Sequence, residues 1–193
     1  MPGLTNLTVF LLRYGHVAAD SLTLLRVLLS LVLVFLGLWG KPALASVVCV
    51  TIFAWFTDLV DGRLASRSND PQRSSWFRRH DTEADLSVAL GVSAYLTISG
   101  YLATWFGLSL IAAAIALRLS HSYNLPWLVI PVPYAALLVL AFRDVSFWGY
   151  LMLGYLLVPL AVGHRRLRGQ YLKGFFADLR NILGAREDLD RDF

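Results

Sequence analysis

The sequence is poor in charge and in cysteine. Only 16% of its 193 residues are charged and 57% are hydrophobic, whereas soluble domains average about 25% charged. The single cysteine, Cys49, lies within an apolar run, so an internal disulfide is excluded and we expect a buried side chain. The N-terminus lacks a basic segment ahead of its first apolar stretch, so no secretory signal is expected. Together these features argue against a soluble or disulfide-stabilised domain and favour an integral membrane protein.

Long apolar runs take up most of the sequence. A helix that crosses a bilayer needs about 20 mostly apolar residues, and six runs approach that length: 21–38, 42–60, 84–105, 108–123, 126–142 and 146–163. The uncharged stretch 86–117 is too long for a single crossing at a rise of about 1.5 Å per residue. We therefore expect a break at "TWFG", residues 104–107, where a tryptophan suits an interface and a glycine suits a turn.

The distribution of positive charge agrees with six crossings. With the break in place, 15 Lys and Arg residues fall on one side, and only Lys41 and Arg143 fall on the other. Loops on the cytoplasmic side carry such an excess. The sequence therefore predicts an all-α integral membrane protein with six transmembrane helices. Both termini are expected in the cytoplasm, with the membrane being a bacterial inner membrane.

Both ends of the chain are predicted to lie at the membrane interface. Apolar residues follow one helical stripe at each end, and basic residues gather elsewhere around the C-terminal stripe, a pattern typical of interfacial helices. We expect one membrane domain over 1–193, with an interfacial helix (1–20), a six-helix core (21–163) and a basic amphipathic C-terminal segment and tail (164–193). Packing against the protein's own cytoplasmic face is the alternative for both ends.

Two acid pairs stand at the borders of neighbouring apolar runs. Asp58 and Asp61 in "WFTDLVDGRLAS" are three residues apart, and Asp81 and Asp85 in "HDTEAD" are four apart, so each pair shares a helix face. Acids near a bilayer cost several kcal/mol unless paired. The two helices are consecutive and antiparallel, so the four carboxylates can converge. Four such acids need a counter-charge, which one or two Mg²⁺ or Mn²⁺ ions would supply.

Residues around the acids suit a phosphate ligand. Gly62 would let another group approach the backbone closely, and Ala65 would leave a shallow surface one helical turn on. The loop 63–80 is rich in arginine, whose forked donors match phosphate oxygens. Arg118 and His121 end the fourth run on the same side. They could bind a phosphorylated alcohol, or they could serve only the charge bias of cytoplasmic loops.

These residues resemble the signature of the CDP-alcohol phosphotransferases, which reads D-x-x-D-G-x-x-A-R, a short spacer and G-x-x-x-D-x-x-x-D. Six positions match in order: Asp58, Asp61, Gly62, Ala65, Asp81 and Asp85. Ser66 replaces the arginine, with Arg67 one residue further on, and Phe77 replaces a glycine after a slightly longer spacer. The segment "DSLTLLR" is similar to the N-x-x-T-x-x-R opening of phosphatidylglycerophosphate synthases. Thr23 and Arg26 match that opening, and Asp20 replaces the asparagine.

The resemblance implies a role for each matching residue. Asp58, Asp61 and Asp81 would hold the metal, and Asp85 would be the general base. The nucleotide of CDP-diacylglycerol would contact six residues: Thr23, Asp58, Gly62, Ala65, Ser66 and Arg67. The reaction would pass the phosphatidyl group to a small polar alcohol and release CMP. Members of the family also look like homodimers.

The acceptor and some rival functions stay open at this point. The opening segment slightly favours glycerol 3-phosphate, although inositol phosphate, serine and phosphatidylglycerol are alternatives. An intramembrane prenyltransferase also binds Mg²⁺-diphosphate through paired acids, but its acid pairs lie far apart in sequence. A cation-binding transporter or channel would place its acids near the bilayer midplane. An inactive relative is the third alternative. No nucleic-acid partner is expected.

Overall fold

A computed structural model describes the backbone of residues 3–67, 81–119 and 129–166, and the side chains of 20–60, 83–119 and 129–157. Within these ranges every regular element is a helix, as predicted. In chain order they are α1 (Gly3–Gly37), the 3₁₀ helix η1 (Lys41–Ala43), α2 (Leu44–Arg67), α4 (Asp81–Ile98), α5 (Thr104–Leu119), α6 (Pro131–Asp144) and α7 (Ser146–Arg166). The six α-helices correspond to the six apolar runs. The C-terminal segment beyond 166 lies outside the described residues.

The helix bounds differ from the prediction in three places. Helix α1 is continuous from Gly3 to Gly37, so it joins residues 3–20 of the predicted interfacial helix to residues 21–37 of the first apolar run. Helix α2 continues beyond residue 60 to Arg67. The predicted break at 104–107 is wrong, because those residues begin α5 and the connection lies at 99–103. Gly100 has a φ of 73°, the left-handed conformation that glycine adopts without strain and that commonly ends a helix.

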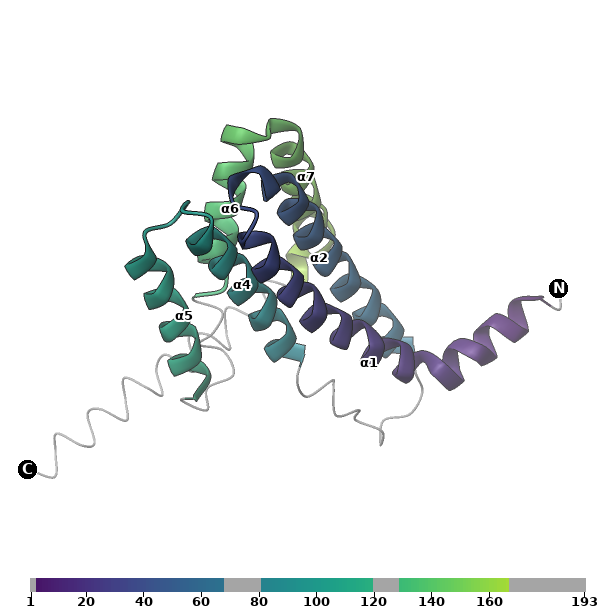
Figure 1. Cartoon of the computed structure of the whole chain (residues 1–193). Helices are drawn as coiled ribbons and strands as arrows, with labels where there is room; N and C mark the ends of the chain where they lie inside the picture. Colours follow the sequence, from purple (N-terminus) through teal and green to yellow (C-terminus); the bar gives the residue numbers. More distant parts are fainter. Residues whose placement is uncertain (1–2, 68–80, 120–128, 167–193) are drawn as a thin grey trace, which may run out of the picture.

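The helices form a bundle around α1, α2 and α4. Helix α1 packs along both α2 and α4, while α6 packs on α7 and α4, and α2 also contacts α7. Helix α5 packs against α4 at one edge, and the N-terminal part of α1 extends beyond the bundle (Figure 1). The C-terminal end of α2 and the N-terminal end of α4 lie at the same end of the bundle (Figure 1). This arrangement brings the two acid-bearing helix ends to one side of the protein.

Aliphatic side chains fill the centre of the bundle. Leu33, Val47, Val92 and Leu137 are fully buried and come from four different helices. Helices α1 and α4 approach closely at Gly91, where an added Cβ would lie 2.7 Å from the backbone oxygen of Ser30. A larger side chain at this position would push the two helices apart. The close packing matters for function because α1 and α4 also meet at the acid-bearing end.

The outer surface is unusually apolar for a soluble protein. Two segments, Asp20–Gly37 and Lys41–Val60, are long and apolar enough to cross a membrane, and only 33% and 39% of them is buried within the protein. A core helix of a soluble protein would be mostly buried. Large exposed side chains include Leu31 and Phe35, which are 61% and 58% exposed. Cys49, which we expected to be buried, is also exposed. Such large apolar patches are typical of surfaces that face lipid or a partner.

A polar cluster connects three helix ends at the opposite end of the bundle. Asp144 accepts hydrogen bonds from Arg143 Nε at 2.6 Å and from the Tyr101 hydroxyl at 2.9 Å. Lys41 Nζ lies 5.4 Å from the centre of the Tyr101 ring. The hydrogen bond from Arg143, followed by that from Tyr101, lowers the pKa of Asp144 to about 2. The cluster therefore joins the α4–α5 connection to the end of α6 through a charged carboxylate.

Candidate active site

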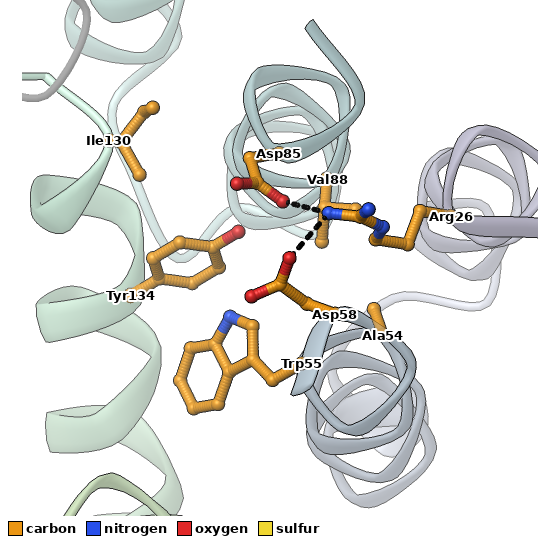
Figure 2. Close-up of a pocket in the computed structure, with 8 residues that line it drawn as sticks. All are labelled: Arg26, Ala54, Trp55, Asp58, Asp85, Val88, Ile130 and Tyr134. Carbon is orange, nitrogen blue, oxygen red and sulfur yellow. Dashed lines mark hydrogen bonds and ion pairs between the residues drawn. The ribbon is translucent and has the colours of Figure 1, made fainter. Parts of the chain in front are cut away.

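Asp58 and Asp85 face each other where the predicted acid site should lie. Asp58 is on the C-terminal part of α2, and Asp85 is on the second turn of α4. Figure 2 shows both carboxylates directed into the space between the helices. Asp61 and Asp81 are on the same two helices, one turn from their partners, but their side chains lie outside the described ones. The structure therefore brings together one acid from each predicted pair.

Arg26 of α1 joins the two acids. Its Nη1 atom donates to Oδ1 of Asp58 at 2.8 Å and to Oδ1 of Asp85 at 2.5 Å (Figure 2). The arginine is 1% exposed, while the Asp58 and Asp85 side chains are 42% and 26% exposed. Three helices that are distant in sequence therefore meet at one charged contact.

Burial makes this contact energetically important. A buried guanidinium is tolerated only when it is paired, and losing a charged hydrogen bond costs about 1.5–3 kcal/mol. Each carboxylate in turn gains a positive neighbour, which reduces their mutual repulsion. The ion pairs therefore stabilise both the placement of α1 and the closeness of the two acids.

A cavity of about 130 Å³ opens beside the ion pairs. Eight residues line it: Arg26, Ala54, Trp55, Asp58, Asp85, Val88, Ile130 and Tyr134. The rings of Trp55 and Tyr134 meet edge to face with their centres 5.0 Å apart. Figure 2 shows the Tyr134 hydroxyl directed toward the carboxylates. The volume suits a cation or a phosphate group and is smaller than the roughly 300–1,000 Å³ of a typical drug-sized site.

The other predicted nucleotide-binding residues lie on the same helices. Thr23 is buried on α1, one turn before Arg26. The remaining four belong to the last turns of α2, where the backbone is described and the side chains are not: Gly62, Ala65, Ser66 and Arg67. These positions place them at the acid-bearing end of the bundle. Their contacts with a nucleotide stay predictions.

The predicted acceptor residues are placed only in part. Arg118 lies near the end of α5 and forms an ion pair with Glu83 of α4, with both side chains partly buried. His121 lies outside the described residues. One carboxylate oxygen of Glu83, Oε2, is buried and has no hydrogen-bond partner among the described residues. Arg118 is thus held beside Glu83, which lies two residues before Asp85 in sequence, and this contact was not anticipated.

The chemistry of the pocket fits a divalent cation. Among the described side chains, no three His, Cys, Asp or Glu residues are grouped closely enough to hold a metal. However, two carboxylates already share one positive group there, so the pocket favours cationic charge. Carboxylate oxygens are the preferred ligands of Mg²⁺ and Mn²⁺. Asp61 and Asp81, one turn along each helix, would complete the predicted set.

Besides the aliphatic lining, three polar or aromatic residues of this pocket were not predicted as part of the site. Arg26 was matched to a motif but counted only as a cytoplasmic positive charge. The sequence did indicate that Arg26 needs a partner, because an arginine within a membrane-spanning run costs about 2.5–3.5 kcal/mol. Trp55 and Tyr134 could not be told apart from the other aromatic residues of the apolar runs. Nothing in the sequence places Tyr134 near Asp85, because only the packing of α6 on α4 does so.

A sequence model of one family, the CDP-alcohol phosphatidyltransferases, matches the chain over residues 16–164. The matched region covers more than half of the chain and includes every residue of the pocket described above. No curated protein matches the chain, and no solved structure does.

Proposed function

The chain belongs to the CDP-alcohol phosphatidyltransferase family, and on that premise we propose that it transfers a phosphatidyl group from CDP-diacylglycerol to glycerol 3-phosphate, releasing CMP. Members of the family are CDP-alcohol phosphotransferases embedded in membranes. One observation carries the proposal for this chain. Asp58 and Asp85, which come from the two halves of the acid pattern, face one pocket and share a single buried arginine.

Each acid has a separate role in the proposed reaction. Asp58, Asp61 and Asp81 hold one or two Mg²⁺ or Mn²⁺ ions, because their carboxylates belong to the helix ends that meet at the pocket. When bound, the metal would neutralise charge on the diphosphate and on the departing CMP. Binding the donor at the bundle end leaves its acyl chains beside the apolar outer surface, which suits a lipid substrate.

Asp85 acts as the general base. The acceptor hydroxyl oxygen attacks the phosphorus that carries the diacylglycerol, and its proton passes to the Asp85 carboxylate. A new phosphorus–oxygen bond forms to the acceptor, and the bond to CMP breaks. Asp85 lines the cavity directly, so an acceptor hydroxyl within it would be in reach. Tyr134, across the cavity, would help to position the acceptor.

The remaining binding roles follow the family signature. Thr23, Gly62, Ala65, Ser66 and Arg67 contact the nucleotide, with Arg67 supplying the charge that Ser66 lacks. Arg118 and His121 bind the phosphate of the acceptor. In this arrangement the ion pair with Glu83 of α4 holds the Arg118 guanidinium in place for the acceptor phosphate. The phosphatidylglycerophosphate synthase opening supports glycerol 3-phosphate over inositol phosphate, serine or phosphatidylglycerol.

We also propose the membrane placement that this reaction needs. The six α-helices of the described residues cross the bacterial inner membrane, with both termini and the acid pocket on the cytoplasmic side. The ends of the chain lie at the interface, and two copies form a homodimer. The apolar, poorly buried segments Asp20–Gly37 and Lys41–Val60 support this placement.

An enzyme assay tests the proposal. The full chain, purified in detergent with Mn²⁺ or Mg²⁺ and CDP-diacylglycerol, would be supplied with each candidate acceptor in turn, and CMP release would be measured. We expect release with glycerol 3-phosphate and its loss on chelation of the metal. Release with only another acceptor would reassign the substrate. No release with any acceptor would contradict the proposed activity.

A further inference from the structure

One nitrogen atom of Arg26 donates to a carboxylate on each of two helices. Nη1 contacts Oδ1 of Asp58 and Oδ1 of Asp85 at once, and the forked donors of arginine match carboxylate and phosphate oxygens alike. The guanidinium is buried, and the two carboxylates are partly exposed. A ligand arriving from solvent therefore reaches the acids more readily than it reaches the arginine.

Nη1 lies 2.8 Å from Oδ1 of Asp58, and Asp58 is one of the acids that would hold a metal ion. Mg²⁺ binds oxygen at about 2.0–2.1 Å, so a cation held by this carboxylate would come close to the guanidinium. Two positive groups that close would repel each other strongly. The arginine and the metal would therefore compete for Asp58.

Resting on the function proposed above, we propose that Arg26 is the resident counter-ion of Asp58 and Asp85. A divalent cation displaces it on binding, and the displaced guanidinium then binds the diphosphate of the donor. Arg26 lines the cavity of about 130 Å³, so its guanidinium can turn into that space without leaving the pocket. Its forked donors match phosphate oxygens.

This exchange couples the binding of metal and donor. Without metal, the two acids hold the guanidinium, and the donor finds no arginine available at this position. With metal, Asp58 has a new partner and the arginine faces the cavity. Because binding free energies are reciprocal, the donor must also tighten metal binding by the same factor. A purely structural arginine would produce no such coupling.

Mn²⁺ titration of Arg26 variants tests the exchange. The full-length protein in detergent would be titrated with Mn²⁺ alone, and free Mn²⁺ would be measured by electron paramagnetic resonance. We expect Arg26→Gln to bind Mn²⁺ about tenfold more tightly than the unaltered protein, because a competing charge is removed. At saturating Mn²⁺, its affinity for CDP should fall about tenfold. Arg143→Gln, which removes an ion-paired arginine at the opposite end of the bundle, should change neither affinity.

Arg26→Lys is the second variant and decides the question if Arg26→Gln does not fold. Lysine keeps the charge but lacks the fork, so we expect Mn²⁺ affinity about threefold above that of the unaltered protein. Unchanged or weaker Mn²⁺ binding in the variant that folds would overturn the proposal. Tighter Mn²⁺ binding with unchanged CDP affinity would overturn its second half.

The test is separable from the proposed function. If the unaltered protein releases no CMP yet its Arg26 variants bind Mn²⁺ more tightly, the phosphatidyl transfer is wrong and the exchange holds. If CMP is released but the variants bind Mn²⁺ normally, the exchange alone fails. If the unaltered protein binds no Mn²⁺, both fail.

Discussion

Replacing Asp85 by asparagine should stop turnover while leaving donor binding nearly intact. Asparagine has almost the same volume as aspartate, and its amide oxygen can still accept the hydrogen bond from Arg26 Nη1. The variant loses the charge that makes Asp85 a base. General-base catalysis contributes about 10²–10⁴-fold, which equals about 2.7–5.4 kcal/mol of activation free energy. We expect kcat to fall by that factor.

The structural cost of the same change should be much smaller. Arg26 keeps its ion pair with Asp58 in the variant, and the Asp85 side chain is 26% exposed. The loss in folding free energy should therefore be near the low end of the about 1.5–3 kcal/mol for a charged hydrogen bond. In a chain of this size each kcal/mol lowers Tm by about 2–4 °C. The unfolding midpoint should thus shift by only a few degrees, and CDP affinity should stay within about threefold.

The assay is CMP release from CDP-diacylglycerol with Mn²⁺, alongside equilibrium binding of CDP and a thermal melt in detergent. Asp144→Asn is the matched control. That carboxylate is also paired with an arginine, Arg143, but it lies at the opposite end of the bundle. The control should release CMP within about twofold of the normal rate. Normal turnover by Asp85→Asn would refute the assignment of the base.

Three further predictions concern metal, packing and pH. Asp61→Asn should weaken both Mn²⁺ and CDP binding by about tenfold or more in equilibrium titrations. Unchanged binding would show that Asp61 is not a metal ligand. Gly91→Ala should destabilise the bundle by about 1–3 kcal/mol in a detergent melt, because the new Cβ would lie 2.7 Å from the Ser30 backbone oxygen. An unchanged melting temperature would contradict the close contact between α1 and α4. The pKa of Asp144 is lowered from 3.8 to about 2, so its stabilising effect is present above pH 4 and is lost as the pH falls toward 2. Asp144→Asn should remove that part of the fall in Tm between about pH 4 and pH 2. If Tm depends on pH in the same way in the variant and in the unaltered protein, the Arg143–Asp144 ion pair contributes nothing to stability.

The sequence predicted the fold class well because apolar runs and helices coincide. Each of the six runs overlaps an α-helix of the described residues, and each acid pair lies on a single helix, as its spacing predicted. The break between α4 and α5 was misplaced because Trp105 and Gly107 resemble an interface and a turn. Helix α4 ends at Ile98 and the turn that follows it contains Gly100, whose positive φ cannot be told from sequence among several nearby glycines.

The candidate site was predicted only to the extent that residue spacing determines it. Spacing places Asp58 and Asp85 on helix faces, but pairing them across α2 and α4 depends on tertiary packing. Arg26 is 32 residues from Asp58 and 59 from Asp85, so no local pattern connects it to either acid. Its isolated charge inside an apolar run was nevertheless a sign that a partner was needed.

Asp58, Asp61, Asp81 and Asp85 are expected to surround one divalent-cation site. Anomalous diffraction from crystals grown with Mn²⁺ would locate the metal without reference to the protein. We expect a peak within bonding distance of carboxylate oxygens from Asp58, Asp61 and Asp81, with the Arg26 guanidinium moved away from Asp58 and Asp85. A peak elsewhere, or Asp61 and Asp81 directed away from the pocket, would contradict it.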